Sequence, residues 1–114
     1  FSEPEYFVNL KKQCPNLKAT LDIKQIMQAG GDYRQFLNVI GSDLTTIHLC
    51  DYDANKKLFI PGRGEFDFVE LFKRLNDLGF DGACLMEVYP QGYKDLDELK
   101  TSYDYLLDCY QKAR

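Results

Sequence analysis

Hydrophobic positions recur at helical spacing in four segments of the chain, and each segment opens with two residues that can cap a helix three positions apart. The capping pairs are Ser2 and Glu5, Asp32 and Gln35, Asp67 and Glu70, and Asp95 and Glu98. Gly41 and Gly79 follow the second and third segments, as glycine often follows the last turn of a helix. The pattern therefore predicts four helices.

Three short runs rich in apolar and β-branched residues lie between the helical segments, at residues 17–23, 45–50 and 82–88. Each run has about six or seven residues, which is a usual length for a strand. Helices and strands therefore alternate along the chain. Such alternation favours parallel strands joined by helical crossovers, so we predict the α/β class with three parallel strands.

The size and composition of the chain suit one globular domain over residues 1–114, because 45% of the residues are hydrophobic and no linker interrupts the pattern. The longest irregular stretch, residues 51–65, follows the second strand, where α/β proteins often carry functional loops. Three parallel strands leave two unpaired edges, so we expect either further chain or self-association. The helix-capping pattern at Phe1 also looks cut from something longer.

Charge and hydropathy disfavour several classes of partner. The net charge is -4, and the 14 basic residues are scattered among 18 acidic ones, which does not suit a nucleic-acid surface. No apolar run approaches the roughly 18 residues of a membrane span, and the start lacks the layout of a signal peptide, so we expect no membrane partner. The four cysteines contain no C-x-x-C pair and favour reduced thiols in the cytoplasm.

A polar side chain stands near the carboxyl end of each predicted strand. Because side chains alternate along a strand, Asp22, His48 and Glu87 fall on one face and apolar residues on the other. Parallel strands end at the same edge of a sheet, so we expect these three side chains to converge there. Taken singly, each could instead be a hydrogen-bonded core residue or a helix cap.

Two carboxylates beside an imidazole are costly to bury unless a cation or a hydrogen-bond network compensates them. A divalent metal would do so, and oxygen ligands with one imidazole suit Mn²⁺, Mg²⁺ or Co²⁺ at least as well as Zn²⁺. Cys50 shares the face of His48, but a small apolar core residue is the favoured role for its thiol.

Several segments, taken in order, resemble the xylose-isomerase-like TIM barrels, a family that includes sugar and sugar-phosphate isomerases and epimerases. They are "TLDIKQ" (20–25), "TTIHLCDYD" (45–53), "PGRGEFDF" (61–68) and "GFDGACLMEVY" (79–89). A complete barrel needs about 250 residues, so the resemblance implies the carboxyl-terminal part of a barrel, a partial (β/α) TIM barrel.

The resemblance implies that Asp22, His48 and Glu87 bind a divalent metal, normally together with a further Glu from a preceding strand that this sequence does not contain. It also implies that Glu87 is the general acid/base, moving a proton on a sugar or sugar phosphate through an enediolate. We therefore expect the isolated chain to be inactive and a longer parent to be the enzyme.

Four further residues could contact the substrate or support the site. Family members often carry D-x-x-H after the first of these strands, and Gln25 stands in place of that His, able to bind a hydroxyl but not to carry a proton. Arg63 could bind a substrate phosphate or carboxylate, or could be a solvated residue of a surface turn. Asp51 could orient His48 or Lys56, or cap the loop. Tyr89 could line a pocket or cover the barrel rim.

Three alternatives remain open. An apurinic-site endonuclease with this barrel needs several histidines and a basic surface, whereas this chain has one histidine. A truncated barrel could bind or assemble without catalysis. A flavodoxin-like module would carry a Gly-rich phosphate loop after its first strand, and the sequence contains none there.

Overall fold

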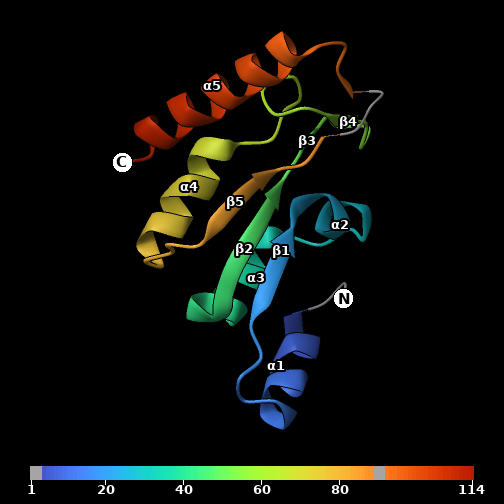
Figure 1. Cartoon of the computed structure of the whole chain (residues 1–114). Coiled ribbons are helices and arrows are strands. Elements are labelled where there is room, and N and C mark those ends of the chain that lie inside the picture. Colours follow the sequence, from blue (N-terminus) through green and yellow to red (C-terminus); the bar gives the residue numbers. More distant parts are fainter. Residues whose placement is uncertain (1–3, 89–91) are drawn as a thin grey trace.

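The structure is a computed structural model that describes residues 4–88 and 92–114 (Figure 1). In chain order its elements are α1 (Pro4–Gln13), β1 (Ala19–Asp22), α2 (Ile23–Gln28), α3 (Tyr33–Ile40), the 3-10 helix η1 (Gly41–Asp43), β2 (Leu44–Leu49), β3 (Asp51–Tyr52), β4 (Leu58–Phe59), α4 (Phe68–Asp77), β5 (Ala83–Met86) and α5 (Leu96–Lys112).

Three parallel strands form the main sheet in the order β1-β2-β5, so β2 is central. Asp22 on β1 pairs with His48 on β2, and His48 pairs with Leu85 on β5. The strands point the same way in Figure 1, which brings their carboxyl ends to one edge. The predicted α/β class and the three parallel strands are confirmed.

The three strands, β1, β2 and β5, cover 19–22, 44–49 and 83–86 in place of the predicted 17–23, 45–50 and 82–88, and two further departures concern whole elements. The first strand ends at Asp22 and not at residue 23, because Ile23 begins a short helix, α2, that the prediction did not contain. The segment 51–65 is not wholly irregular, since β3 and β4 form a two-stranded antiparallel sheet within it. The described residues thus contain the four predicted helices, one additional α-helix, α2, and the 3-10 helix η1.

Aspartates at the helix starts act as the predicted caps. The side chains of Asp32, Asp67 and Asp95 accept hydrogen bonds from the backbone N–H groups of Arg34, Glu70 and Glu98. Such bonds satisfy N–H groups that have no partner within the helix. Gly41 and Gly79, which follow α3 and α4, have φ of 52° and 70°, a conformation that glycine adopts at low cost. Of the first predicted pair, Ser2 lies outside the described residues.

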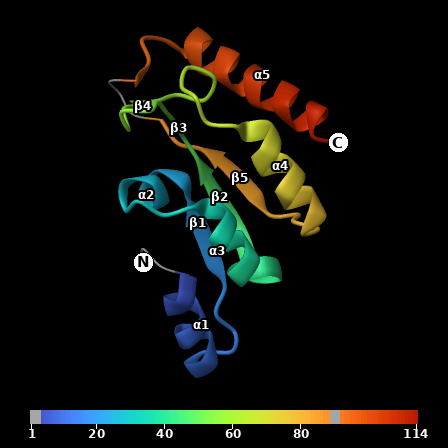
Figure 2. The same cartoon turned by 180° about the vertical axis from the view of Figure 1, so that it is seen from behind.

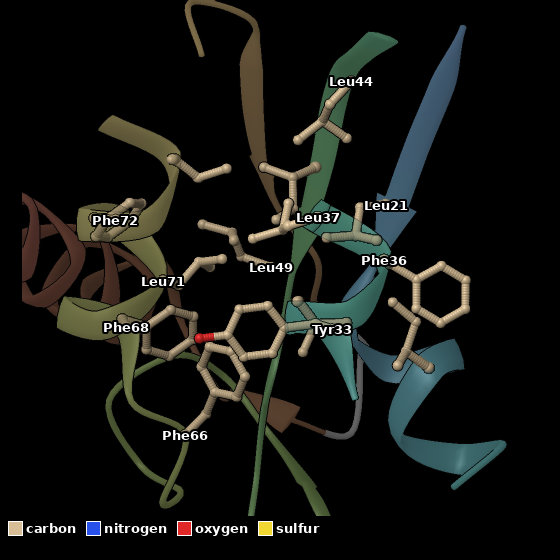
Figure 3. Close-up of a cluster of buried hydrophobic side chains, with 14 of the residues drawn as sticks. Leu21, Tyr33, Phe36, Leu37, Leu44, Leu49, Phe66, Phe68, Leu71 and Phe72 are labelled. Atoms are coloured by element: carbon tan, nitrogen blue, oxygen red, sulfur yellow. The ribbon is translucent and has the colours of Figure 1, made fainter. Parts of the chain in front are cut away.

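One face of the sheet packs against helices to form the core. The helix α3 lies behind β2 in Figure 1 and in front of it in the reverse view of Figure 2. Side chains from the sheet, α3 and α4 interdigitate in Figure 3, among them Leu21, Leu49 and Leu71. Ile47 and Leu71 are 0% exposed, so removing such side chains would leave cavities.

The opposite face of the sheet carries the polar and accessible side chains. Thr20 is exposed, His48 is half-buried, and Leu85 is 50% exposed. This agrees with the predicted alternation along β1 and β2, in which Leu21, Ile47 and Leu49 face the core. None of the helices within residues 4–88 and 92–114 has the length and hydropathy needed to cross a membrane.

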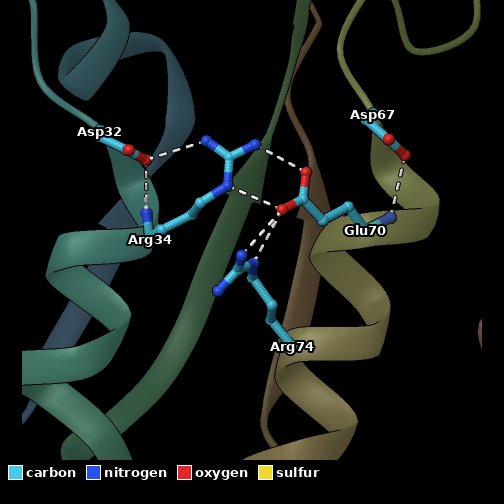
Figure 4. Close-up of polar contacts among 5 residues, drawn as sticks. All are labelled: Asp32, Arg34, Asp67, Glu70 and Arg74. Carbon is cyan, nitrogen blue, oxygen red and sulfur yellow. Dashed lines mark hydrogen bonds and ion pairs between the residues drawn. The ribbon is translucent and has the colours of Figure 1, made fainter.

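An ionic network ties α3 to α4 near their first turns (Figure 4). Arg34 donates from Nη2 and Nε to the two oxygens of Glu70 at 2.6 and 2.7 Å, and Arg74 donates to Glu70 at 3.0 Å. The two bonds from Arg34 fix the geometry of both partners. They hold the pKa of the Glu70 carboxyl down at about 2.

Candidate metal centre

Asp22 has two roles that use different oxygens of its carboxylate. Oδ1 accepts a hydrogen bond of 3.0 Å from the backbone N–H of Gln25 and so caps α2. Oδ2 lies 3.5 Å from Nδ1 of His48, across the β1–β2 pairing. The cap holds the carboxylate at the edge of the sheet with one oxygen directed toward the imidazole.

His48 lies between Asp22 and Glu87 because its strand, β2, lies between β1 and β5. Its Nδ1 lies 3.5 Å from Asp22 Oδ2 and 3.6 Å from Glu87 Oε2, and its side chain is 34% exposed. Both separations exceed ordinary hydrogen-bond length. The nitrogen is therefore placed between two carboxylates without being bonded tightly to either.

Glu87 follows β5 and remains in register with the central strand. Its backbone N–H donates to the carbonyl of Leu49 at 2.8 Å, which extends the β2–β5 pairing beyond the strand end. Its side chain is 23% exposed. This pairing keeps the base of Glu87 close to the end of β2, so its carboxylate reaches His48.

The three side chains fit a divalent cation. One nitrogen or oxygen from each of Asp22, His48 and Glu87 lies within 4.8 Å of the other two. Bonds of about 2.0 to 2.2 Å to one ion separate neighbouring ligand atoms by about 3 to 3.5 Å, so small side-chain adjustments would let all three bind together. The donor set of two carboxylates and an imidazole also matches the ligands that divalent metals take in proteins.

A residue that the sequence prediction missed also contacts this cluster. Lys24, in the first turn of α2, places its Nζ 3.5 Å from Oε1 of Glu87, and the two side chains are 21% and 23% exposed. Only part of this was visible in the sequence: Asp22 and Gln25 form a capping pair that can start a helix containing Lys24, whereas the approach of that helix to Glu87 depends on the fold.

Cys50 is a core residue. It is 1% exposed and belongs to the main hydrophobic cluster. Burial, followed by the nearby charges of Glu87 and Asp22, raises the pKa of its thiol to about 12. The thiol therefore stays protonated, which agrees with the packing role favoured for it from the sequence.

Asp51 holds the loop that follows β3. Its carboxylate, 1% exposed, accepts hydrogen bonds from the backbone N–H groups of Gly62, Gly64 and Phe66 at 2.8 to 3.0 Å. A fourth bond comes from the N–H of Tyr52. These bonds serve loop capping, the second predicted role, and the orientation of His48 or Lys56 by Asp51 stays a prediction.

The two predicted substrate contacts lie in different surroundings. Gln25 is exposed on α2, three residues after Asp22, beside the cluster. Arg63 donates from Nη2 to Oε1 of Glu98 at 2.9 Å, an ion pair that joins the loop to the start of α5. Arg63 is thus bound to a structural partner. Tyr89 lies outside the described residues.

A cavity of about 360 Å³ lies elsewhere, between the first turns of α3 and α4. Its charged groups include Arg34 and Glu70, which are already paired with each other. Neither His48 nor Glu87 lines it. The candidate functional site is therefore the cluster of Asp22, His48 and Glu87 and not this cavity.

The chain is similar in sequence to two longer curated proteins. It is 29% identical over 100 residues to a Xenopus laevis protein named "Putative hydroxypyruvate isomerase", covering 80% of this chain and 36% of that protein. It is 31% identical over 98 residues to an uncharacterized protein of Mycobacterium leprae (strain TN), covering 83% and 34%. The chain therefore spans about a third of the length of these curated relatives.

Comparisons of structure agree on the fold. The crystal structure of the IOLI protein, which has a bound zinc atom, matches with a TM-score of 0.71 and 18% identity over 96% of this chain and 43% of that one. A D-tagatose 3-epimerase-like protein matches with a TM-score of 0.62 and 21% identity over 92% and 42%. The family model of the xylose isomerase-like TIM barrel matches residues 3–109. The chain therefore belongs to the xylose isomerase-like TIM barrel family.

Proposed function

We propose that this chain is the carboxyl-terminal part of a divalent-metal-dependent isomerase or epimerase whose substrate is a sugar or sugar phosphate. The observation that carries the proposal is the meeting of Asp22, His48 and Glu87 within 4.8 Å at the carboxyl edge of three parallel strands. In barrels of this kind, catalytic groups stand at that edge.

In this proposal Asp22 and His48 hold the cation, and Glu87 both holds it and moves a proton. A bound divalent ion would supply Lewis acidity that polarises a carbonyl and acidifies the adjacent C–H bond. Glu87 would take that proton and leave an enediolate, which then regains a proton at the neighbouring carbon in an isomerase, or on its opposite face from a further Glu of a preceding strand in an epimerase. The side chain of Glu87 is 23% exposed, so it is reached from solvent, which supports this role.

The substrate class is inferred from the family and from named relatives. The relatives include one named as a hydroxypyruvate isomerase and one described as D-tagatose 3-epimerase-like, both names of enzymes that act on small oxygenated carbon compounds. The exposed amide of Gln25 could donate a hydrogen bond to a substrate hydroxyl. Arg63 would contribute only after leaving Glu98, so we assign it a lesser part.

We propose further that residues 1–114 act as one domain that completes its sheet against other chain, either the rest of a barrel or a second copy. The accessible face that carries Leu85, 50% exposed, supports this, as does the open edge of β5. Sedimentation at micromolar concentration should reveal dimers or larger species of the 114-residue chain. A stable monomer would contradict self-association.

The unpaired cysteines favour a reducing compartment such as the cytoplasm.

The catalytic assignment is tested in a longer protein that carries the preceding barrel strands. Turnover of a keto sugar in D₂O should incorporate deuterium next to the carbonyl, which NMR detects. The substitution Glu87→Gln should reduce incorporation by more than about 1,000-fold, because it removes the proton carrier. Glu5→Gln, on the exposed side of α1, serves as the control. Unchanged incorporation with Glu87→Gln would show that another group moves the proton.

A further inference from the structure

The carboxylate of Glu87 has different neighbours on its two oxygens. Oε2 lies 3.6 Å from Nδ1 of His48, and Oε1 lies 3.5 Å from Nζ of Lys24. Lys24 comes from the helix after β1, whereas Glu87 follows β5, on the other side of the central strand. The lysine therefore reaches across the end of β2 and lies beside the cluster that would hold the metal.

The charges of these groups determine how strongly the cluster attracts a cation. Asp22 and Glu87 together supply two negative charges, and the ammonium of Lys24 cancels one of them. The exposed fractions, 21% for Lys24 and 23% for Glu87, place the pair in a partly dehydrated setting. Opposite charges attract more strongly in such a setting than in bulk water. A divalent ion must therefore compete with the ammonium for Glu87.

We propose that Lys24 is a built-in counter-ion that holds Glu87 when no metal is bound and lowers the affinity of the Asp22–His48–Glu87 cluster for divalent cations. The inference rests on the proposed metal function and adds a positioning residue to it. It does not require Lys24 to touch substrate.

Two consequences follow from this arrangement. When a cation binds, the ammonium must move away from Glu87 or stay beside a doubly charged ion, and either change reduces the net gain of binding. The affinity is then set by the lysine as well as by the three ligands. A fourth anionic ligand from another part of the chain or from a substrate would offset the lysine charge and so favour metal binding.

The test is a titration of the 114-residue chain with Mn²⁺, in which the electron paramagnetic resonance signal of the free ion measures how much Mn²⁺ remains unbound. Lys24→Met, which keeps the length of the side chain and removes its charge, should bind Mn²⁺ about tenfold more tightly than the wild type. Lys24→Arg, which keeps the charge, should remain close to the wild type. Lys18→Met is the matched control. The side chain of Lys18 is 56% exposed and its ammonium pairs with Asp43 at 3.1 Å, not with a residue of the Asp22–His48–Glu87 cluster.

A second measurement does not depend on the free-ion signal. A cation that binds the folded chain raises its melting temperature, and more so when it binds tightly. About 1 mM Mn²⁺ should therefore raise the melting temperature of Lys24→Met more than that of the wild type. The melting curve without metal shows whether each variant folds.

The outcomes separate the inference from the function on which it rests. Equal Mn²⁺ affinity in the wild type and in a folded Lys24→Met variant would overturn the role of Lys24 and leave the metal site in place. Absence of binding in both would overturn the metal site and the inference together. Tighter binding by Lys24→Arg as well would also overturn it, because the charge would not be the cause.

Discussion

Asp22 and His48 are partners across two parallel strands, and Oδ2 of one lies 3.5 Å from Nδ1 of the other. The pairing register fixes this distance, because their Cα atoms stand at the same level of β1 and β2. The same aspartate caps α2, so one carboxylate couples the start of a helix to the geometry of the cluster. Neither residue can shift along its strand without breaking the sheet register.

Close packing around Asp51 predicts a strict requirement for glycine at position 64. A Cβ atom there would overlap the Asp51 carboxylate and would lie 2.7 Å from the carbonyl oxygen of Tyr52. We expect Gly64→Ala to lower the free energy of unfolding by about 2 kcal/mol, measured by urea denaturation. At Gly92 the corresponding atom meets, within the described part of the chain, only Ile60 at 3.7 Å, so Gly92→Ala should change stability by less than about 0.5 kcal/mol. Equal effects at the two positions would contradict the packing described for Asp51.

Stability should depend on pH through Glu70. Arg34 lowers the pKa of this carboxyl from 4.5 to about 2, so ionised Glu70 stabilises the fold above its unfolded pKa and loses that effect as the pH falls. Glu70 is partly exposed, so solvent screening limits the contribution to about 1 kcal/mol near neutral pH. The difference in stability between wild type and Glu70→Gln should disappear between about pH 4.5 and pH 2. A difference that persisted or grew in acid would contradict the network of Figure 4.

The hydroxyl of Tyr33 predicts a stabilising substitution. Tyr33 is 7% exposed, and its hydroxyl oxygen has no hydrogen-bond partner within the described part of the chain. Figure 3 shows the hydroxyl directed toward Phe68, in apolar surroundings. Because a buried polar group without a partner is costly, Tyr33→Phe should raise the free energy of unfolding by about 1 kcal/mol. Tyr103→Phe is the control, since Tyr103 is 55% exposed, and a loss of stability in Tyr33→Phe would reveal a missing partner.

The sequence predicted the parts of the fold that depend on local rules. Aspartate caps, glycine at helix ends and apolar alternation marked α3, α4, α5 and the faces of the strands. It predicted that Asp22, His48 and Glu87 share a face and a level, and the structure brings their ligand atoms within 4.8 Å. Period-two alternation and parallel register are enough for that inference.

The parts that the sequence did not predict depend on long-range contacts. Three of the four backbone N–H groups that bond to the Asp51 carboxylate lie 11 to 15 residues away, so only the folded loop shows that this carboxylate caps them. The strand order β1-β2-β5 and the position of α2 bring Lys24 close to Glu87. These two residues are 63 positions apart in the sequence, so their contact could not be predicted from local patterns. The partner of Arg63, Glu98, lies on α5 for the same reason.

The most direct test of the account is the binding of Mn²⁺ or Zn²⁺ to the 114-residue chain by isothermal titration calorimetry. We expect one cation per cluster, with affinity reduced more than about 100-fold by Asp22→Asn, His48→Gln or Glu87→Gln, since each removes a ligand. Asparagine can still cap α2, so Asp22→Asn separates metal binding from helix capping. Asp108→Asn on the exposed side of α5 is the control. Unchanged binding in all three ligand variants would contradict the proposed metal centre.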